Sequence, residues 1–298
     1  MSLPVSILLG LVLSFVIGLF AYQRGSLTRG GVVGAILTGT AIVGFGGFVP
    51  GFLLVAFFVS SSLLSKYQAR AKQSVNEKFQ KGSRRDFGQA MANGGWAAVL
   101  AIALGLAPLM GGDARTQQLL FAAFVGAIAT VTADTWATEI GVLSRTMPRM
   151  ITTWRLVPVG TSGGITLPGT ITALIGAMFI GAMVNTADVF WFVITDFARA
   201  GSVGADVFLT RLASGVGIIF VASSSGLAGA LFDSLLGATV QGIYFSEYDE
   251  WQTEKAFDSQ GSPTRLIRGV GWFDNDWVNF ISSVFGSLVA AGISFLIL

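Results

Sequence analysis

Apolar residues fill long, nearly uninterrupted stretches of this chain, and short polar or glycine-rich segments separate them. Most of these stretches approach the roughly 20 residues that a helix needs to cross the hydrocarbon core of a bilayer. We therefore predict an all-α polytopic membrane protein with about eight transmembrane helices in one bundle, forming a single integral membrane domain over residues 1–298. The predicted spans are residues 3–20, 31–48, 51–64, 90–109, 118–131, 167–184, 207–231 and 278–298.

The basic residues lie in the polar connections on one side of the predicted bundle. The longer connections cover about residues 65–90, 135–167 and 233–277, and with the short segment around Arg24 and Arg29 they hold 15 of the 18 Lys and Arg residues. Because cytoplasmic loops of membrane proteins are enriched in these residues, we predict that these connections are cytoplasmic. Both chain termini then lie on the other side of the membrane.

The composition supports this class and excludes several kinds of chemistry. Hydrophobic residues make up 53% of the chain and charged residues 11%, as in a membrane protein. A net charge of +2 is too small for the concentrated basic surface of a nucleic-acid-binding protein, so no nucleic acid partner is expected. The chain has neither cysteine nor histidine, which excludes disulfides, thiolate chemistry and imidazole catalysis. Catalysis would rest on carboxylates, basic side chains and hydroxyls.

Carboxylates follow the fifth apolar stretch in the segment Ala-Asp-Thr-Trp-Ala-Thr-Glu-Ile-Gly, residues 133–141. On a helix Asp134, Thr138 and Glu139 lie on neighbouring parts of one face. A carboxylate here could simply end the apolar span, but an ionisable residue beside a membrane span is by default a candidate for function. Further acids and amides occur at the same predicted cytoplasmic ends: Asp233, Asp274, Asn275, Asp276 and Asn279.

A glycine-rich segment at residues 160–164 precedes the sixth span. Glycines before a helix expose backbone N–H groups that can bind phosphate, and the helix N-terminus adds a partial positive charge. Taken alone, the segment is equally compatible with helix packing. Carboxylates on the same face are suitable ligands for Mg²⁺, which favours carboxylates and phosphate oxygens. The combination favours phosphoryl transfer, which depends mainly on positioning and charge stabilisation.

Several motifs resemble an integral membrane family that includes the plant and cyanobacterial phytyl-phosphate kinase of tocopherol synthesis. They are ADTWATEIG (133–141), ITTWRLVPVGTSGGIT (151–166), SGLAGALFDSLLGATVQ (225–241), GSRRDFGQAMANGG (82–95) and WFDNDWVNF (272–280). The resemblance covers most of the chain. It implies transfer of the terminal phosphate of CTP or ATP to a membrane-bound prenyl monophosphate, giving the diphosphate, with Mg²⁺ as cofactor at the cytoplasmic face.

The resemblance also carries roles to particular residues. Asp134, Glu139, Asp233 and Asp276 are the expected catalytic acids, and Asp134, Asp233 and Asp276 are the expected metal ligands. The expected phosphate- and substrate-binding residues are Arg84, Arg85, Asn93, Arg155, Gly160, Thr161, Ser162, Gly163, Gly164, Asp274, Asn275 and Asn279.

Two other functions stay open at this stage: a membrane transporter or channel, and a lipid cytidylyltransferase. An ion-coupled transporter usually has a carboxylate near the middle of the bilayer, whereas the motif acids lie at one end of the predicted spans. For a lipid substrate we expect an apolar groove beneath the acids, lined by Phe124, Ile128, Leu231, Phe280 and Phe285. The glycine-rich spans could pack helices within one chain or between chains, so a homo-oligomer is one expected arrangement.

Overall fold

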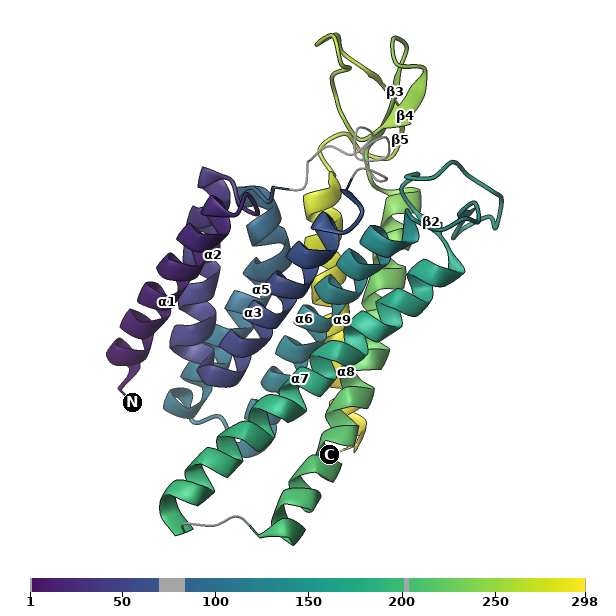
Figure 1. Ribbon diagram of the computed structural model, residues 1–298. Coiled ribbons are helices and arrows are strands. Elements are labelled where there is room, and N and C mark those ends of the chain that lie inside the picture. Colours follow the sequence, from purple (N-terminus) through teal and green to yellow (C-terminus); the bar gives the residue numbers. More distant parts are fainter. Residues whose placement is uncertain (1, 70–83, 201–203, 298) are drawn as a thin grey trace.

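The computed structural model describes residues 2–69, 84–200 and 204–297. Within these residues eight helical segments are long and apolar enough to cross a membrane, and they pack side by side (Figure 1). The predicted fold class is therefore confirmed. The helices are α1 (Leu3–Gln23), α2 (Arg29–Ala41) continued by a π-helical turn (Ile42–Gly46), α3 (Phe48–Lys66), α5 (Phe87–Leu106), α6 (Ala114–Gly141), α7 (Leu167–Ala200), α8 (Ala205–Thr239) and α9 (Asn275–Ile297).

Short strands form at one end of the bundle, where the sequence predicted only polar connections. β1 (Arg149–Met150) pairs with β2 (Gly164–Ile165), and β3 (Ile243–Ser246) lies between β4 (Trp251–Thr253) and β5 (Arg265–Arg268), all antiparallel. We call this side of the molecule the strand end. Both chain termini lie at the opposite end (Figure 1).

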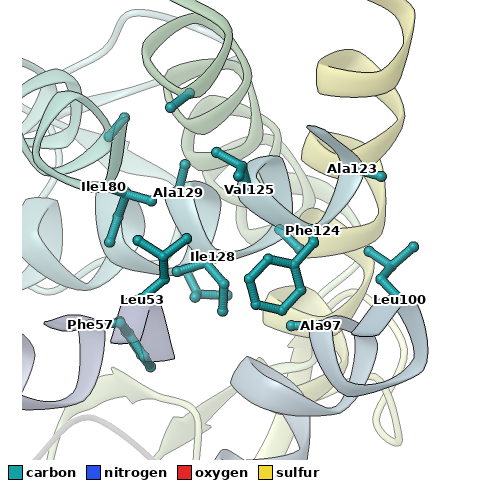
Figure 2. Packing of buried hydrophobic residues seen from close by; sticks show 14 of the residues in the cluster. Leu53, Phe57, Ala97, Leu100, Ala123, Phe124, Val125, Ile128, Ala129 and Ile180 are labelled. Carbon is teal, nitrogen blue, oxygen red and sulfur yellow. The ribbon is translucent and has the colours of Figure 1, made fainter. Parts of the chain in front are cut away.

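Helix α6 forms the centre of the core. Its Phe124 and Ile128 side chains are fully buried among residues such as Leu53 of α3 and Ala97 of α5 (Figure 2). Five other membrane-crossing helices, α3, α5, α7, α8 and α9, pack around it. An apolar side chain gains little by leaving lipid, so close packing rather than hydrophobicity holds such a core together.

Small residues allow α9 to approach α6 closely. A Cβ atom added at Gly126 would lie 2.4 Å from Cβ of Ala290, and one added at Gly286 would lie 1.9 Å from Oγ1 of Thr130. The Thr130 hydroxyl donates to the carbonyl of Gly126 at 2.8 Å, so this polar group is satisfied within its own helix. The backbones of α6 and α9 therefore meet directly, which fixes where the end of each helix lies.

Several helices extend beyond the predicted spans toward the strand end. The connections predicted at about residues 135–167 and 233–277 begin later, because α6 continues to Gly141 and α8 to Thr239. Hydropathy detects where a helix leaves the hydrocarbon, whereas a polar side chain does not interrupt backbone hydrogen bonding. Asp134, Glu139 and Asp233 consequently lie on rigid helices. Residues 187–195, which lie beyond the predicted sixth span, are part of α7.

Part of the predicted basic connection at residues 65–90 lies outside the described residues, namely residues 70–83. On its far side α5 begins at Phe87, with Asp86 and Gln89 forming a capping box: the Asp86 carboxylate accepts from the Gln89 N–H at 2.9 Å and the Gln89 side chain accepts from the Asp86 N–H at 3.0 Å. This cap fixes the first turn of α5 at the strand end.

Candidate active site

A polar cavity of about 290 Å³ lies at the strand end of the bundle. Side chains from α3, α5, α6, α7, α8 and α9 line it, together with the glycine-rich segment before α7. The structure brings most of the predicted site residues into this lining. They are Asp134, Glu139, Asp233, Arg85, Asn93, Gly160, Thr161, Ser162, Gly163, Gly164, Asn275 and Asn279.

Two carboxylates from different helices meet in the cavity. Asp134 of α6 and Asp233 of α8 interact directly. The Oδ2 atom of Asp233 is buried, and no described residue gives it a hydrogen bond of ordinary geometry. Two touching carboxylates cannot both remain ionised at low energy, so they must share a proton or hold a cation. An unsatisfied oxygen in such a pair fits a cation ligand.

Glu139 lies one turn further along α6 and connects the acids to the basic side of the cavity. Its carboxylate accepts a hydrogen bond from the Ser65 hydroxyl at the end of α3. It also interacts with the guanidinium of Arg85, the one basic side chain in the cavity lining among the described residues. Burial lowers the pKa of Arg85, and Glu139 opposes that shift. The guanidinium of Arg85 therefore supplies positive charge to a cavity that is otherwise rich in carboxylates.

The position of Arg85 is fixed by both its backbone and its side chain. Its carbonyl accepts from the Thr28 N–H at 2.9 Å, and a Cβ at Gly31 would lie 2.1 Å from that carbonyl oxygen. Its guanidinium donates to the Ser62 hydroxyl at 3.0 Å and lies 5.5 Å from the centre of the Phe58 ring. These contacts hold a guanidinium, which can bind phosphate through two parallel hydrogen bonds, in one place.

The glycine-rich segment is held against α8 by the three-stranded sheet. Ser162 donates to the side chain of Gln241 at 2.7 Å, and Gln241 in turn donates to Glu254 at 2.9 Å. Arg268 of β5 donates to the carbonyl oxygens of Ser162 at 3.0 Å and Gly237 at 2.9 Å. The sheet therefore supports the loop that forms one wall of the cavity.

Three helix N-termini meet at the cavity. The N-termini of α5, α7 and α9 contribute Gln89, Thr166 and Asn275 to the lining, whereas the acids Asp134 and Asp233 lie further inside α6 and α8. Helix N-termini carry partial positive charge and favour anions. The cavity can therefore bind an anion such as phosphate, and its acids are suitable ligands for a cation beside that anion.

Four predicted site residues lie outside the cavity lining. Arg84 donates to the Leu27 carbonyl at 3.1 Å. Arg155 is exposed beside the short β1–β2 hairpin. Asp274 caps α9 by accepting from the Asp276 N–H at 3.0 Å, and Asp276 is not part of the cavity lining. Among the described residues no three acids are grouped to hold a metal ion, so of the three predicted ligands only Asp134 and Asp233 come together.

The sequence did not single out several polar residues of the lining or its support, among them Ser65, Gln89, Gln241 and Glu254. Gln241 is the last residue of the motif at residues 225–241, and this position could have indicated its role. The prediction of an apolar groove was wrong for Phe124 and Ile128, which are fully buried in the helix core and cannot line a groove. Leu231 does line the polar cavity, and Phe285 stacks on Phe232 at 4.2 Å between ring centres.

The fold and the cavity define an integral membrane protein with a polar site at one end of its helix bundle. The chain belongs to the family described as "Integral membrane protein DUF92", whose model matches residues 12–287. This is the integral membrane family, including phytyl-phosphate kinase, that the motifs indicated, and it makes the chain a multi-pass membrane protein.

Curated relatives cover nearly the whole chain. Protein PGR of Arabidopsis thaliana is 32% identical over 294 residues, which cover 96% of this chain and 95% of the relative. The uncharacterized membrane protein MJ0933 of Methanocaldococcus jannaschii is 26% identical, covering 97% and 94%. Protein VTE6, chloroplastic, of Arabidopsis thaliana is 29% identical, covering 94% of this chain and 68% of the relative. No solved structure matches the chain significantly.

Proposed function

We propose that this protein transfers the terminal phosphate of CTP or ATP to a membrane-bound prenyl monophosphate such as phytyl phosphate, producing the diphosphate. The observation that carries the proposal is the acid pair Asp134 and Asp233 opposite Arg85, the glycine-rich segment and three helix N-termini, all around one cavity. Membership of the family that includes phytyl-phosphate kinase supports the same chemistry.

The reaction requires little covalent chemistry from the protein. An oxygen of the acceptor phosphate forms a bond to the terminal phosphorus of the nucleotide, and the bond from that phosphorus to its bridging oxygen breaks, releasing the nucleoside diphosphate. A phosphate monoester is largely ionised near neutral pH, since its second pKa is about 6. No strong general base is then needed. Arg85 and the helix N-termini stabilise the negative charge on the transferring group.

The acid pair suits a magnesium ion. Asp134 and Asp233 would be its protein ligands, because they touch and one oxygen of Asp233 lacks a partner among the described residues. Asn275 and Asn279 place amide groups in the same cavity. The cavity also contains the carboxylates of Glu139 and Glu254, which would repel a phosphate. Bound magnesium would neutralise part of the phosphate charge and so reduce this repulsion.

The direct test uses purified protein in lipid nanodiscs with CTP or ATP labelled on the terminal phosphate. Phytol, phytyl phosphate and a soluble sugar phosphate serve as acceptors, with magnesium or with EDTA. We expect label in the phytyl diphosphate only, and none in EDTA. Transfer of a cytidylyl group with release of pyrophosphate would instead identify a cytidylyltransferase. Failure to modify any prenyl acceptor would contradict the proposal.

A second prediction concerns the side of the membrane on which the site lies. The positive-inside rule predicts that the strand end is cytoplasmic. The cysteine-free chain allows single cysteines at Gln260, an exposed residue of the strand end, and at Ala114, exposed at the opposite end of α6. In intact cells an impermeant maleimide should label Ala114→Cys but not Gln260→Cys, and permeabilisation should expose both. Labelling of Gln260→Cys in intact cells would reverse the orientation.

A further inference from the structure

A second cavity, of about 890 Å³, runs along the bundle beside the polar site. Its lining is mostly apolar and comes from one face of α1, from α2 and its π-helical turn, and from α3 and α5. The size falls in the range of about 300–1,000 Å³ that is typical of small-molecule sites. Of its polar residues, Thr38 donates within α2 to the Gly34 carbonyl at 2.9 Å, so it offers the cavity little polarity.

The two cavities share three residues. Arg85, Gln89 and Asn93 appear in the lining of both, and Gln89 and Asn93 lie four residues apart on one face of α5. From this junction the apolar cavity follows α1 past Ile17 and Leu13 to Leu9. In this direction α1 runs toward the end of the bundle that carries the chain termini (Figure 1). A molecule with a charged head and an apolar chain could therefore place its head in the polar cavity and its chain in the adjoining apolar cavity.

The walls of the apolar cavity meet at the π-helical turn. Helix α1 packs on α2 and on this turn, whereas α3 packs on α6, on α7 and on the same turn. Both helices also carry lipid-type side chains that are exposed in the structure, such as Val12 on α1 and Val59 on α3. The cavity thus lies between two helices that are both in a position to face the bilayer.

We propose that this cavity binds the hydrocarbon chain of the prenyl monophosphate whose phosphate lies at Arg85. The inference rests on the proposed function and adds the place of the substrate tail. An anionic amphiphile fits this place better than bulk lipid, because the apolar cavity ends on the guanidinium of Arg85 that it shares with the polar site. A chain already in lipid gains little by entering another apolar place. The cavity therefore orients the phosphate head of the substrate and selects acceptors by chain length, and it contributes little to binding affinity.

Tryptophan substitutions along α1 test the path of the chain. Ile17 is near the junction and Leu9 lies about 12 Å further along the helix at 1.5 Å per residue. Ile17→Trp should lower kcat/KM for geranylgeranyl and geranyl monophosphate by at least about tenfold, and leave isopentenyl monophosphate nearly unchanged. Leu9→Trp should affect only the longest of these acceptors.

Matched controls are available on α1 outside the face that lines the cavity. Val16 and Leu8 are next to the test residues, are 57% and 60% exposed and do not line the cavity. Val16→Trp and Leu8→Trp should keep the wild-type dependence on chain length. If Ile17→Trp and Leu9→Trp also kept the wild-type dependence on chain length, the proposal would be overturned and bulk lipid would fill the cavity.

A readout without turnover separates this inference from the proposed function. An alkyl monophosphate with a diazirine in the middle of its chain should crosslink to residues 9–17 of α1 or 52–58 of α3, and Ile17→Trp should reduce the yield. Crosslinking there without phosphoryl transfer would reject the kinase activity but keep the tail site. Transfer with crosslinks confined to the outer surface of the bundle would reject the tail site alone.

Discussion

Asp134→Asn should reduce phosphoryl transfer by on the order of a thousandfold or more while the protein remains folded in the membrane. Asparagine has nearly the same size as aspartate but carries no charge, so the change removes one of the two proposed cation ligands. The measurement is kcat/KM for phytyl phosphate at saturating magnesium, calculated per amount of folded protein in nanodiscs for the variant and the wild type. Asp233→Asn should have a similar effect, and the double variant should lose little more, because the pair acts as a unit.

The thermal stability of the same variant distinguishes catalysis from structure. Asp134 and Asp233 touch, so removing one charge relieves repulsion when no divalent cation is present. We expect the melting temperature of Asp134→Asn without magnesium to equal or exceed that of the wild type. Magnesium should raise the melting temperature of the wild type but not of the variant. Asp188→Asn, exposed in the opposite half of α7, is the control and should behave as wild type. Normal turnover in Asp134→Asn would remove the acid pair from the mechanism.

The helices could be predicted because a bilayer imposes a simple length requirement on apolar stretches. The pattern did not show that α6 and α8 continue into the polar region, because backbone hydrogen bonds continue a helix whether its side chains are polar or apolar. The Thr135 hydroxyl, for example, is satisfied within α6 by donating to the Val131 carbonyl at 2.7 Å. This continuation matters for function. It places Asp134 and Asp233 on rigid helices, where their separation is set by helix packing rather than by loop conformation.

The site shows a similar division. The sequence motifs predicted Asp134, Asp233 and Arg85 as site residues. They predicted Arg84 equally, because the sequence alone does not show which of the two arginines faces the cavity. The structure separates them through an isolated bridge between Leu27 and Arg85. Successive side chains of an extended segment point to opposite sides, and here Arg84 reaches the Leu27 carbonyl while Arg85 faces the cavity.

Uncharged contributors were harder to predict. Ser65 lies at the end of an apolar helix and Gln89 in a capping box, and both positions are common for such residues in any helical protein. Only the contact between Ser65 and Glu139, 74 positions apart in sequence, gives Ser65 a place in the site. Such long-range contacts depend on how the helices pack, and a single sequence does not record them.

The glycine-rich loop gives the second large effect that we expect. Gly163 has a φ of +82°, and a Cβ there would lie 2.5 Å from Cβ and 2.6 Å from Cα of Ala238 on α8. Gly163→Ala therefore meets two obstacles: the left-handed conformation costs an L-residue about 1–2 kcal/mol, and the overlap with helix backbone forces the loop away from α8. The loop carries Ser162, whose bond to Gln241 would break or lengthen. We expect a loss of at least about a hundredfold in kcat/KM, since a displacement near 1 Å at a reacting centre has that effect.

Gly261 provides a matched control for the conformational part of this effect. It also has a φ of +82°, but no atom lies within 4 Å of the Cβ that alanine would add. Gly261→Ala therefore has only the free-energy cost of the left-handed conformation. Gly261 lies in an exposed turn outside the cavity lining, so the variant should retain activity within a few-fold of wild type. If Gly163→Ala binds nucleotide and turns over as Gly261→Ala does, the loop does not form part of the phosphate site. If Gly163→Ala loses turnover while its melting temperature falls no further than that of Gly261→Ala, the contact of the loop with α8 positions the phosphate rather than stabilising the bundle.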